Sequence, residues 1–403
     1  MNPRLDHLQP YPFERLNALL GGVTGNPAKD FIPLSLGEPK HETAHFLIEA
    51  YRDADTLRQG LATYPPTKGL PELRSAIAAF VNRRFHLDAA PIDPETQILP
   101  VNGTREALFA IAQAVIDPDA QSTTLIPNPF YQIYEGAALI AGSRPVYVPC
   151  PAEKNFKPDF ASVTEEEWSR CAALYLCTPG NPTGAVMSVS DLQAVIRKSD
   201  EYDFVIISDE CYSELYDVEP PPGLLEAAAA MGRTNYRNCI AVNSLSKRSN
   251  LPGLRSGYAC GDALIIERFL LYRTYHGSAM PVHNQLLRTV AWRDETHVEA
   301  NRKLYRRKYD AVAEVLGNTW PMETPAAGFY LWPETPVDDE TFTVRLLESE
   351  NIKVVPGSYL GRERDGRNPG SRRVRMALVA TLDECIEAAE RLKGFIERRD
   401  FAK

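Results

Sequence analysis

The chain has 403 residues, of which 44% are hydrophobic and 24% are charged, and its formal net charge is -9. This length allows two or three domains with substantial cores, and the acidic balance offers no basic surface for nucleic acid. No stretch is apolar for long enough to span a membrane, and the first residues lack the apolar core of a signal peptide. The cysteines form no C-x-x-C pair, so we expect buried free thiols in a cytoplasmic protein with no bound metal.

The N-terminal residues 1–30 predict an arm followed by a short helix. The next segment is expected to form a short apolar strand from Ile32 and to turn sharply at Gly37-Glu-Pro-Lys-His41. A glycine at this turn lets the backbone approach another group closely. Further along, Pro71 is suited to the first turn of a helix that runs to about Phe85.

Between residues 95 and 260, short apolar segments alternate with amphipathic helices. Because strand, turn and helix repeat in this order, the segment predicts a parallel sheet with helices on both faces. The expected strands are Ile98–Val101, Thr123–Ile126, Ala173–Cys177, Phe204–Ile207, Cys239–Val242 and Arg255–Cys260, and the expected helices include Glu106–Ile116 and one from about Asp191. From about residue 290 a new series begins with a long charged helix, Asp294–Leu316, which indicates a second, smaller α/β domain.

Polar or aromatic side chains follow directly after several of these strands. The carboxyl ends of parallel strands lie at one edge of a sheet, where open α/β sheets bind their ligands. Chance rarely brings so many such groups to one edge, so they predict a single binding crevice. These groups are Gly103-Thr104, Tyr131, Asn181, Asp209 and Ser244-Leu-Ser-Lys247.

The segment Ser244-Leu-Ser-Lys247 indicates the chemistry. A lysine amine forms a Schiff base with an aldehyde, and pyridoxal phosphate is the aldehyde cofactor that uses this route. Ser244 and Arg255 are residue types that hold a phosphate, and the turn at Gly103-Thr104 before a helix is a further anion site. Each motif alone also fits a plain structural explanation, either a solvated surface lysine or an ordinary helix start.

Taken together, the groups supply a complete pyridoxal phosphate site. Asp209 would hold the ring nitrogen protonated, which makes the ring an electron sink for charge at the substrate Cα. Tyr212 and Asn181 would donate hydrogen bonds to the phenolic oxygen, and Tyr131 would stack on the ring. Lys247, once freed by substrate, would transfer the proton, which requires a lowered pKa. The residues expected to bind the cofactor are Gly103, Thr104, Arg105, Tyr131, Asn181, Asp209, Tyr212, Ser244, Ser246, Lys247 and Arg255.

Over nearly its whole length the chain resembles the class I aminotransferases, the aspartate-aminotransferase-like group of pyridoxal phosphate fold type I. The resemblance implies a large α/β domain, residues 46–290, with a mostly parallel seven-stranded sheet. It also implies a smaller C-terminal α/β domain, residues 291–403, to which part of the arm, residues 1–45, is added. The matching motifs are Asn181-Pro-Thr-Gly184, Asp209-x-x-Tyr212, Ser244-x-Ser-Lys247 with Arg255, and the late Arg375.

The same resemblance assigns three further residues. Arg375 is expected to bind the substrate α-carboxylate with its bidentate fork, and the backbone of Gly37 is expected to help. Tyr64 corresponds to a tyrosine that reaches the cofactor phosphate of the neighbouring subunit. The resemblance therefore implies a homodimer with shared active sites that acts on amino-acid and 2-oxo-acid substrates.

Several longer stretches are similar to the N-succinyldiaminopimelate aminotransferases of bacterial lysine biosynthesis. This similarity implies reversible conversion of N-succinyl-LL-2,6-diaminopimelate and 2-oxoglutarate to N-succinyl-2-amino-6-oxopimelate and glutamate. Lys40 is a candidate for binding a distal carboxylate, although a solvated lysine explains it equally well. The similar stretches are Leu36–His41, Asn102–Phe109, Pro127–Tyr134 and Ser244–Arg255.

Several alternatives stay open at this stage. Aspartate, an aromatic amino acid or N-acetylornithine could be the amino donor. The same fold also supports β-lyase or decarboxylase reactions, because the reaction type follows from which Cα bond lies perpendicular to the ring. A non-catalytic binding module of this fold is disfavoured by the intact Lys247 and Asp209. A nicotinamide-dependent oxidoreductase would need the glycine fingerprint G-x-G-x-x-G, which the sequence lacks.

Overall fold

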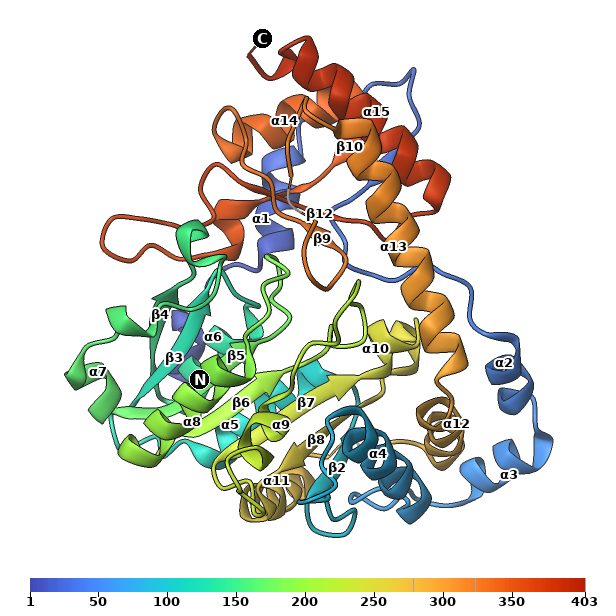
Figure 1. Cartoon of the computed structure of the whole chain (residues 1–403), viewed down its shortest axis with the longest axis vertical. Coiled ribbons are helices and arrows are strands. Elements are labelled where there is room, and N and C mark those ends of the chain that lie inside the picture. The colour runs from blue at the N-terminus through green and yellow to red at the C-terminus, as the bar shows by residue number, and fades with distance from the viewer. Residues whose placement is uncertain (278, 323, 403) are drawn as a thin grey trace.

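The computed structural model describes residues 1–277, 279–322 and 324–402, and Figure 1 shows a large sheet with helices around it below a smaller C-terminal part. Within these residues the largest sheet has seven strands in the order β2-β8-β7-β6-β5-β3-β4. β8 runs antiparallel to β2 and β7, whereas the remaining neighbours are parallel. The prediction of a mostly parallel seven-stranded sheet is confirmed. The strands are β2 (Ile98–Val101), β3 (Thr123–Asn128), β4 (Arg144–Pro149), β5 (Cys171–Cys177), β6 (Val205–Asp209), β7 (Cys239–Ser244) and β8 (Gly257–Gly261).

Helices cover both faces of this sheet, because side chains alternate between the faces along each strand. Ile206 belongs to a core formed with α4, α8, α9 and α12, and its neighbour Ile207 belongs to the core formed with α5, α6 and α11. The helices of this part are α2 (His45–Tyr51), α3 (Ala54–Ala62), α4 (Pro71–Arg84), α5 (Thr104–Val115), α6 (Ile133–Ala141), α7 (Glu165–Ser169), α8 (Val189–Tyr202), α9 (Leu224–Ala229), α10 (Leu245–Arg248), α11 (Ala263–His276) and α12 (Val282–Arg293).

The sequence did not predict strand β4. Its sequence, Arg-Pro-Val-Tyr-Val-Pro, contains two prolines, and proline lacks the N–H that a central strand needs. The structure places β4 at the edge of the sheet, where it pairs in parallel only with β3. At an edge, one side of the strand has no partner in the sheet, so the prolines are tolerated there.

The C-terminal part is built from small sheets and the helices α13, α14 and α15, and α1 of the N-terminal arm packs on it. β11, β12 and β9 form an antiparallel sheet, and β1 near the N-terminus pairs in parallel with β10, with Ile32 opposite Ile352. The early chain thereby becomes part of this region, while the domain boundaries near residues 45 and 290 stay predictions. The elements are α1 (Pro12–Leu20), β1 (Ile32–Pro33), α13 (Thr296–Leu316), β9 (Tyr330–Leu331), α14 (Asp339–Glu350), β10 (Ile352–Lys353), β11 (Val355–Pro356), β12 (Val374–Ala377) and α15 (Leu382–Glu397).

Two further predictions concern the chain as a whole. All seven cysteines are free thiols, and all of them except Cys177 are buried, as predicted. Among the residues that the structure describes, no helix has the length and apolar character needed to cross a membrane.

Candidate active site

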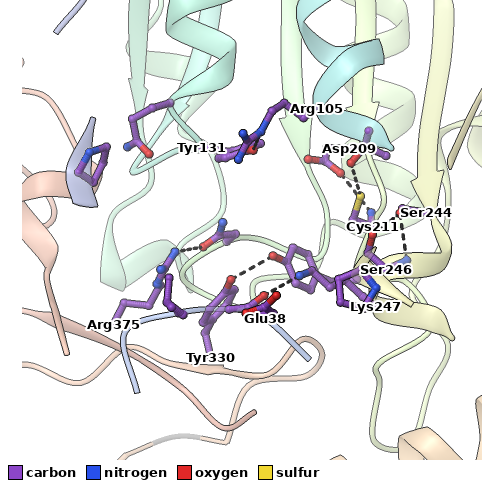
Figure 2. Close-up of a pocket in the computed structure, with 18 of the residues that line it drawn as sticks. Glu38, Arg105, Tyr131, Asp209, Cys211, Ser244, Ser246, Lys247, Tyr330 and Arg375 are labelled. Carbon is purple, nitrogen blue, oxygen red and sulfur yellow. Dashed lines mark hydrogen bonds between the residues drawn. The ribbon is translucent and has the colours of Figure 1, made fainter. Parts of the chain in front are cut away.

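A cavity of about 330 Å³ lies at the carboxyl edge of the large sheet, and Figure 2 shows the side chains that line it. Most of the predicted site residues meet there. Because β8 is antiparallel, Arg255, which precedes this strand, reaches the same edge as the residues that follow the parallel strands. The predicted residues that line the cavity are Gly37, Thr104, Arg105, Tyr131, Asn181, Asp209, Tyr212, Ser244, Ser246, Lys247, Arg255 and Arg375.

Lys247 lies in the short helix α10, directly after β7. Its Nζ donates a hydrogen bond of 2.6 Å to the carbonyl oxygen of Gly37. Burial lowers the pKa of the Lys247 amine to about 8, and the positive charges of Arg375 and Arg255 act in the same direction. An amine with such a pKa is partly neutral at mildly alkaline pH, which a nucleophile or proton carrier requires.

Donors for an anion gather beside Lys247, at the start of α5. Gly103 caps this helix with a φ of 85°, and a Cβ at this position would collide with the guanidinium group of Arg255. Ser244, at the end of β7, adds a hydroxyl that accepts a 3.0 Å hydrogen bond from the N–H of Ser246. A helix N-terminus, two hydroxyls and an arginine together form a site suited to a phosphate dianion.

Asp209 ends β6 and is only 4% exposed. The Tyr134 hydroxyl donates to its Oδ2 at 2.8 Å, and the N–H of Cys211 donates to its Oδ1 at 3.2 Å. Burial raises the pKa of Asp209, whereas these hydrogen bonds and the charge of Lys247 oppose the rise. The result is an oriented carboxyl group suited to pairing with a protonated ring nitrogen.

An aromatic wall borders the cavity after β3. Nε of Arg105 donates a 3.1 Å hydrogen bond to the Tyr131 hydroxyl, and the Tyr131 ring meets the Tyr134 ring edge-on at 5.8 Å. Burial raises the pKa of Tyr131, so its phenol stays protonated. Tyr11, from the N-terminal arm, lines the same cavity.

Arg375 reaches the cavity from β12 in the C-terminal part. Its Nη1 donates to Oδ1 of Asn181 at 3.2 Å, and its Nη2 donates to the carbonyl oxygen of Ser35 at 2.9 Å. Its Nε is buried and has no hydrogen-bond partner. A buried N–H without an acceptor is destabilising, and among the residues that the structure describes this Nε has none.

Sequence analysis missed several residues that line the cavity. Tyr330 is the most informative, because its hydroxyl lies 3.2 Å from the Tyr212 hydroxyl and its ring centre lies 4.6 Å from the guanidinium carbon of Arg375. Its only sequence signal was an aromatic cluster, Gly328-Phe-Tyr-Leu-Trp332, which is equally typical of a packed strand. The other missed lining residues include Tyr11, Phe13, Glu38, Gln132 and Cys211.

Two predicted residues lie elsewhere. Lys40 is exposed and does not line the cavity, and its charge acts on Glu384 at the start of α15. This placement does not support a role for Lys40 in binding a distal carboxylate. Tyr64 is 98% exposed and also lies outside the cavity, so its role toward a neighbouring subunit stays a prediction.

Comparison with known proteins now identifies the family. Residues 29–392 match the family model described as aminotransferase class I and II. The chain belongs to the class I and II aminotransferases. It is 29% identical to the LL-diaminopimelate aminotransferase of Desulforudis audaxviator, over 99% of this chain and 98% of that protein. It is also 29% identical to an aspartate aminotransferase of Pyrococcus abyssi, over 99% of each chain. A solved aminotransferase from Neisseria meningitidis is 44% identical, with a TM-score of 0.91, over 97% of this chain and 98% of that one.

Enzymes of this family use pyridoxal phosphate, and the cavity of this aminotransferase has groups that fit the cofactor. Thr104, Ser244 and Arg255 surround a place for a phosphate, while Asp209 and Lys247 line the same cavity. The space that Gly103 leaves beside Arg255 would be filled by any larger residue. When bound, the cofactor supplies a ring that withdraws electrons from the substrate Cα.

Proposed function

We propose that this aminotransferase transfers the amino group of N-succinyl-LL-2,6-diaminopimelate to 2-oxoglutarate, forming N-succinyl-2-amino-6-oxopimelate and glutamate. The observation that carries the proposal is a pair of guanidinium groups, Arg375 and Arg105, that line one cavity and lie apart across it in Figure 2. A substrate with carboxylates at both ends needs cationic groups at both ends of its site.

Each residue then has a role set by its contacts. Arg375 binds the α-carboxylate with its guanidinium group, which Asn181 orients. Lys247 is the lysine to which the cofactor attaches, and its amine transfers the proton at the substrate Cα. Asp209 holds the ring nitrogen protonated. Tyr212 and Asn181 would donate to the phenolic oxygen, Tyr131 would pack on the ring, and Gly103, Thr104, Ser244, Ser246 and Arg255 would hold the phosphate.

The far end of the substrate would meet Arg105. The sequence places Arg105 among the residues that bind the cofactor, and that role stays a prediction. Its Nε donates to the Tyr131 hydroxyl, which holds its guanidinium group at the cavity wall. Tyr11 and Gln132 add polar groups to the same lining. A distal carboxylate on this side would find one charged and two neutral donors.

The names of the relatives support a dicarboxylic substrate but do not choose among such substrates. The relatives named as LL-diaminopimelate and aspartate aminotransferases are equally similar to this chain. The preference for the N-succinyl compound comes from the four longer stretches that resemble N-succinyldiaminopimelate aminotransferases. Aspartate is the second candidate, because the Pyrococcus abyssi relative bears that name.

The deciding experiment compares amino donors with 2-oxoglutarate as the acceptor. N-succinyl-LL-2,6-diaminopimelate should give the highest kcat/KM among it, LL-2,6-diaminopimelate, aspartate, phenylalanine and N-acetylornithine. If another donor wins by about tenfold, or about 1.4 kcal/mol of transition-state preference, the substrate proposal is wrong. Arg105→Gln should weaken the dicarboxylic donors but leave phenylalanine nearly unchanged, which tests the distal site separately.

We also propose a homodimer in which Tyr64 completes the partner's site. The support is the 98% exposure of this aromatic residue, which does not line the cavity of its own chain. Mixing a Lys247→Ala protein with a Tyr64→Phe protein should form hybrids with one native site and one doubly damaged site, so activity should recover. Subunit exchange without any recovery would contradict the sharing of sites.

A further inference from the structure

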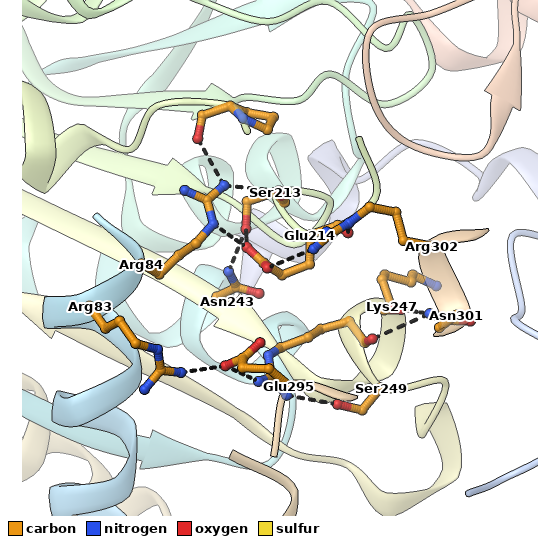
Figure 3. Close-up of polar contacts among 12 residues, drawn as sticks. Arg83, Arg84, Ser213, Glu214, Asn243, Lys247, Ser249, Glu295, Asn301 and Arg302 are labelled. Carbon is orange, nitrogen blue, oxygen red and sulfur yellow. Dashed lines mark hydrogen bonds and ion pairs between the residues drawn. The ribbon is translucent and has the colours of Figure 1, made fainter. Parts of the chain in front are cut away.

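A buried asparagine holds the main chain at Lys247. Asn301 on α13 is 6% exposed, and its Nδ2 donates to the carbonyl oxygens of Lys247 at 3.0 Å and Arg248 at 3.3 Å; Figure 3 shows Asn301 beside Lys247. Carbonyl oxygens only accept hydrogen bonds, so these contacts fix which end of the amide faces them. Oδ1 of Asn301 must therefore face away, toward Nδ1 of His41 at 2.7 Å.

This geometry sets the state of the His41 ring. Since Oδ1 of Asn301 accepts, Nδ1 of His41 carries the hydrogen, and Nε2 of the neutral ring is left as an acceptor. Nζ of Lys308 lies 2.7 Å from that Nε2 and also donates to the carbonyl oxygen of Val379 at 3.4 Å. All the hydrogen bonds thus point one way, from Lys308 through His41 and Asn301 to the Lys247 carbonyl.

The chain of hydrogen bonds joins three segments that form the cavity. His41 follows Gly37, whose carbonyl oxygen accepts from the Lys247 amine, and the main chain of His41 accepts from the Asn250 amide. Val379 lies just after β12, the strand that carries Arg375. Lys247 is consequently held at both its amine and its main chain by groups that connect to His41.

We propose that His41 is a positioning residue for Lys247. Held between Lys308 and Asn301, it sets the distance between the Gly37 segment and the main chain of Lys247, and it links both to the segment after β12. The role of the positioned amine rests on the proposed function of Lys247. The hydrogen bonds from Lys308 through His41 and Asn301 do not depend on that function.

The surroundings of His41 favour the neutral ring that this series of hydrogen bonds requires. Burial lowers the pKa of His41, and the nearby charge of Lys308 lowers it further, against the opposing hydrogen bond to Asn301. Burial also lowers the pKa of Lys308, to about 8, against the nearby Cys385 and Glu384 of α15. Tyr305 packs against the ring of His41, with centroids 4.5 Å apart. Protonation of His41 would set an N–H against the Lys308 ammonium. The hydrogen bond between His41 and Lys308 should therefore break as the pH falls through the lowered pKa of His41.

The first test reads the tautomer directly. In protein labelled with ¹⁵N-histidine, long-range ¹H–¹⁵N spectra at pH 8 should show a neutral ring with its hydrogen on Nδ1 whose signal vanishes in His41→Gln. The ring of His297, whose Nδ1 lies 2.5 Å from Oδ1 of Asp294, should give a second signal of this kind that remains in that variant. Unpaired histidine in water prefers the hydrogen on Nε2, so the expected result is distinctive. A His41 ring with its hydrogen on Nε2, or a protonated ring at pH 8, would overturn the proposal whatever the enzyme's substrate.

The second test separates positioning from stability. His41→Phe keeps an aromatic ring on Tyr305 but removes both hydrogen bonds. His297→Phe is the matched control. Like His41, His297 is half-buried and forms hydrogen bonds through both ring nitrogens, in its case to Asp294 and Ser249, but it lies on α13.

Both variants should lower the Tm. Only His41→Phe should shift the pH midpoint of the bound cofactor's absorbance and lower kcat about tenfold with a smaller change in KM. His41→Gln keeps one donor and one acceptor, so its pH midpoint should lie between those of His41→Phe and the wild type. Equal midpoints in wild type and His41→Phe would show that His41 is merely structural.

Discussion

The cavity has two walls that are built in different ways. On the wall of Lys247, the reactive groups follow neighbouring strands of one sheet, so that Asp209 ends β6 and Ser244 ends β7. On the wall of Arg375, the contacts join distant segments, since Arg375 bonds to Ser35 and Asn181, which lie 340 and 194 residues away in the sequence. Strand register fixes the first wall, whereas the packing of the C-terminal part on the large sheet fixes the second.

Because the two walls are held differently, we expect them to serve different steps of the reaction. A wall held by a continuous sheet suits the chemical step, which requires fixed distances between the reacting groups. A wall assembled from separate segments can change position when a ligand binds, and the role proposed for Arg375 puts substrate binding on this wall. Substitutions on the first wall should therefore reduce kcat, and those on the second should mainly affect substrate binding.

The largest effect is expected at Lys247. Lys247→Ala should lower turnover by about 10⁴-fold or more, because under the proposed function it removes both the attachment point of the cofactor and the group that transfers the proton. The folded protein should still bind the cofactor non-covalently. Mass spectrometry after borohydride reduction of the wild type should find the pyridoxyl group on Lys247. A pyridoxyl group on another lysine would show that the first wall has been assigned to the wrong residue.

Asp209→Ala should come next, with a loss of roughly 10³-fold in kcat, or about 4 kcal/mol, and a smaller change in KM. The carboxylate matters most as negative charge develops at the substrate Cα, so the loss falls mainly on the transition state. Tyr134→Phe is a useful comparison, since it removes only one hydrogen bond to Asp209. Near-normal turnover of Asp209→Ala would mean that this residue does not face the ring nitrogen.

The residues of the first wall could be predicted from sequence because each is marked by the segment directly before it. Asp209, Ser244 and Lys247 each follow an apolar segment of strand length, and parallel strands bring such positions to one edge without further information. Their chemical types then indicated the cofactor. The one strand of the large sheet that was missed, β4, lies at the edge and contains prolines, and it contributes no residue to the cavity lining.

The second wall could be predicted only in part. The family resemblance identified Arg375 and Gly37, but nothing local indicated that Tyr330 would meet both Tyr212 and Arg375. Such contacts depend on how the C-terminal part packs on the large sheet, and no local motif of the sequence indicates that packing. Lys40 lies three residues after Gly37 in the sequence and yet is exposed outside the cavity, so proximity in sequence does not place a side chain in the site, and its role stays a prediction.

On the second wall, Arg375→Lys should lower kcat/KM for every amino donor by roughly 100-fold, mostly through KM. Lysine retains the charge but loses the planar fork that pairs with a carboxylate. The borohydride-labelled lysine and the cofactor absorbance should stay as in the wild type, because the first wall is unchanged. A selective loss for dicarboxylic donors alone would place Arg375 at the distal carboxylate instead.

The lowered pKa of Lys247 gives a smaller effect that belongs to the first wall alone. In cofactor-free protein, the neutral amine fraction should rise about tenfold per pH unit below the pKa of about 8 and level off above it. Acetylation of Lys247 with a trace of acetic anhydride, read by mass spectrometry against free Nα-acetyllysine in the same tube, should follow this curve. A Lys247 rate that keeps rising as steeply as that of the free amino acid would show that burial does not lower its pKa.

The smallest effect is expected at Tyr330, the residue that joins the two walls. Its hydroxyl contacts Tyr212 on the first wall, and its ring packs on Arg375 of the second. Tyr330→Phe keeps the ring and removes only the hydroxyl, so we expect a loss of about fivefold in kcat/KM, or about 1 kcal/mol, the usual value of one hydrogen bond. Tyr330→Leu removes the ring as well, and because the packing on Arg375 is then lost, it should add a rise in KM. If Tyr330→Phe and Tyr330→Leu behave alike, the ring does not support Arg375, and the second wall must be held by Ser35 and Asn181 alone. If both variants match the wild type, the two walls are not coupled through Tyr330 at all.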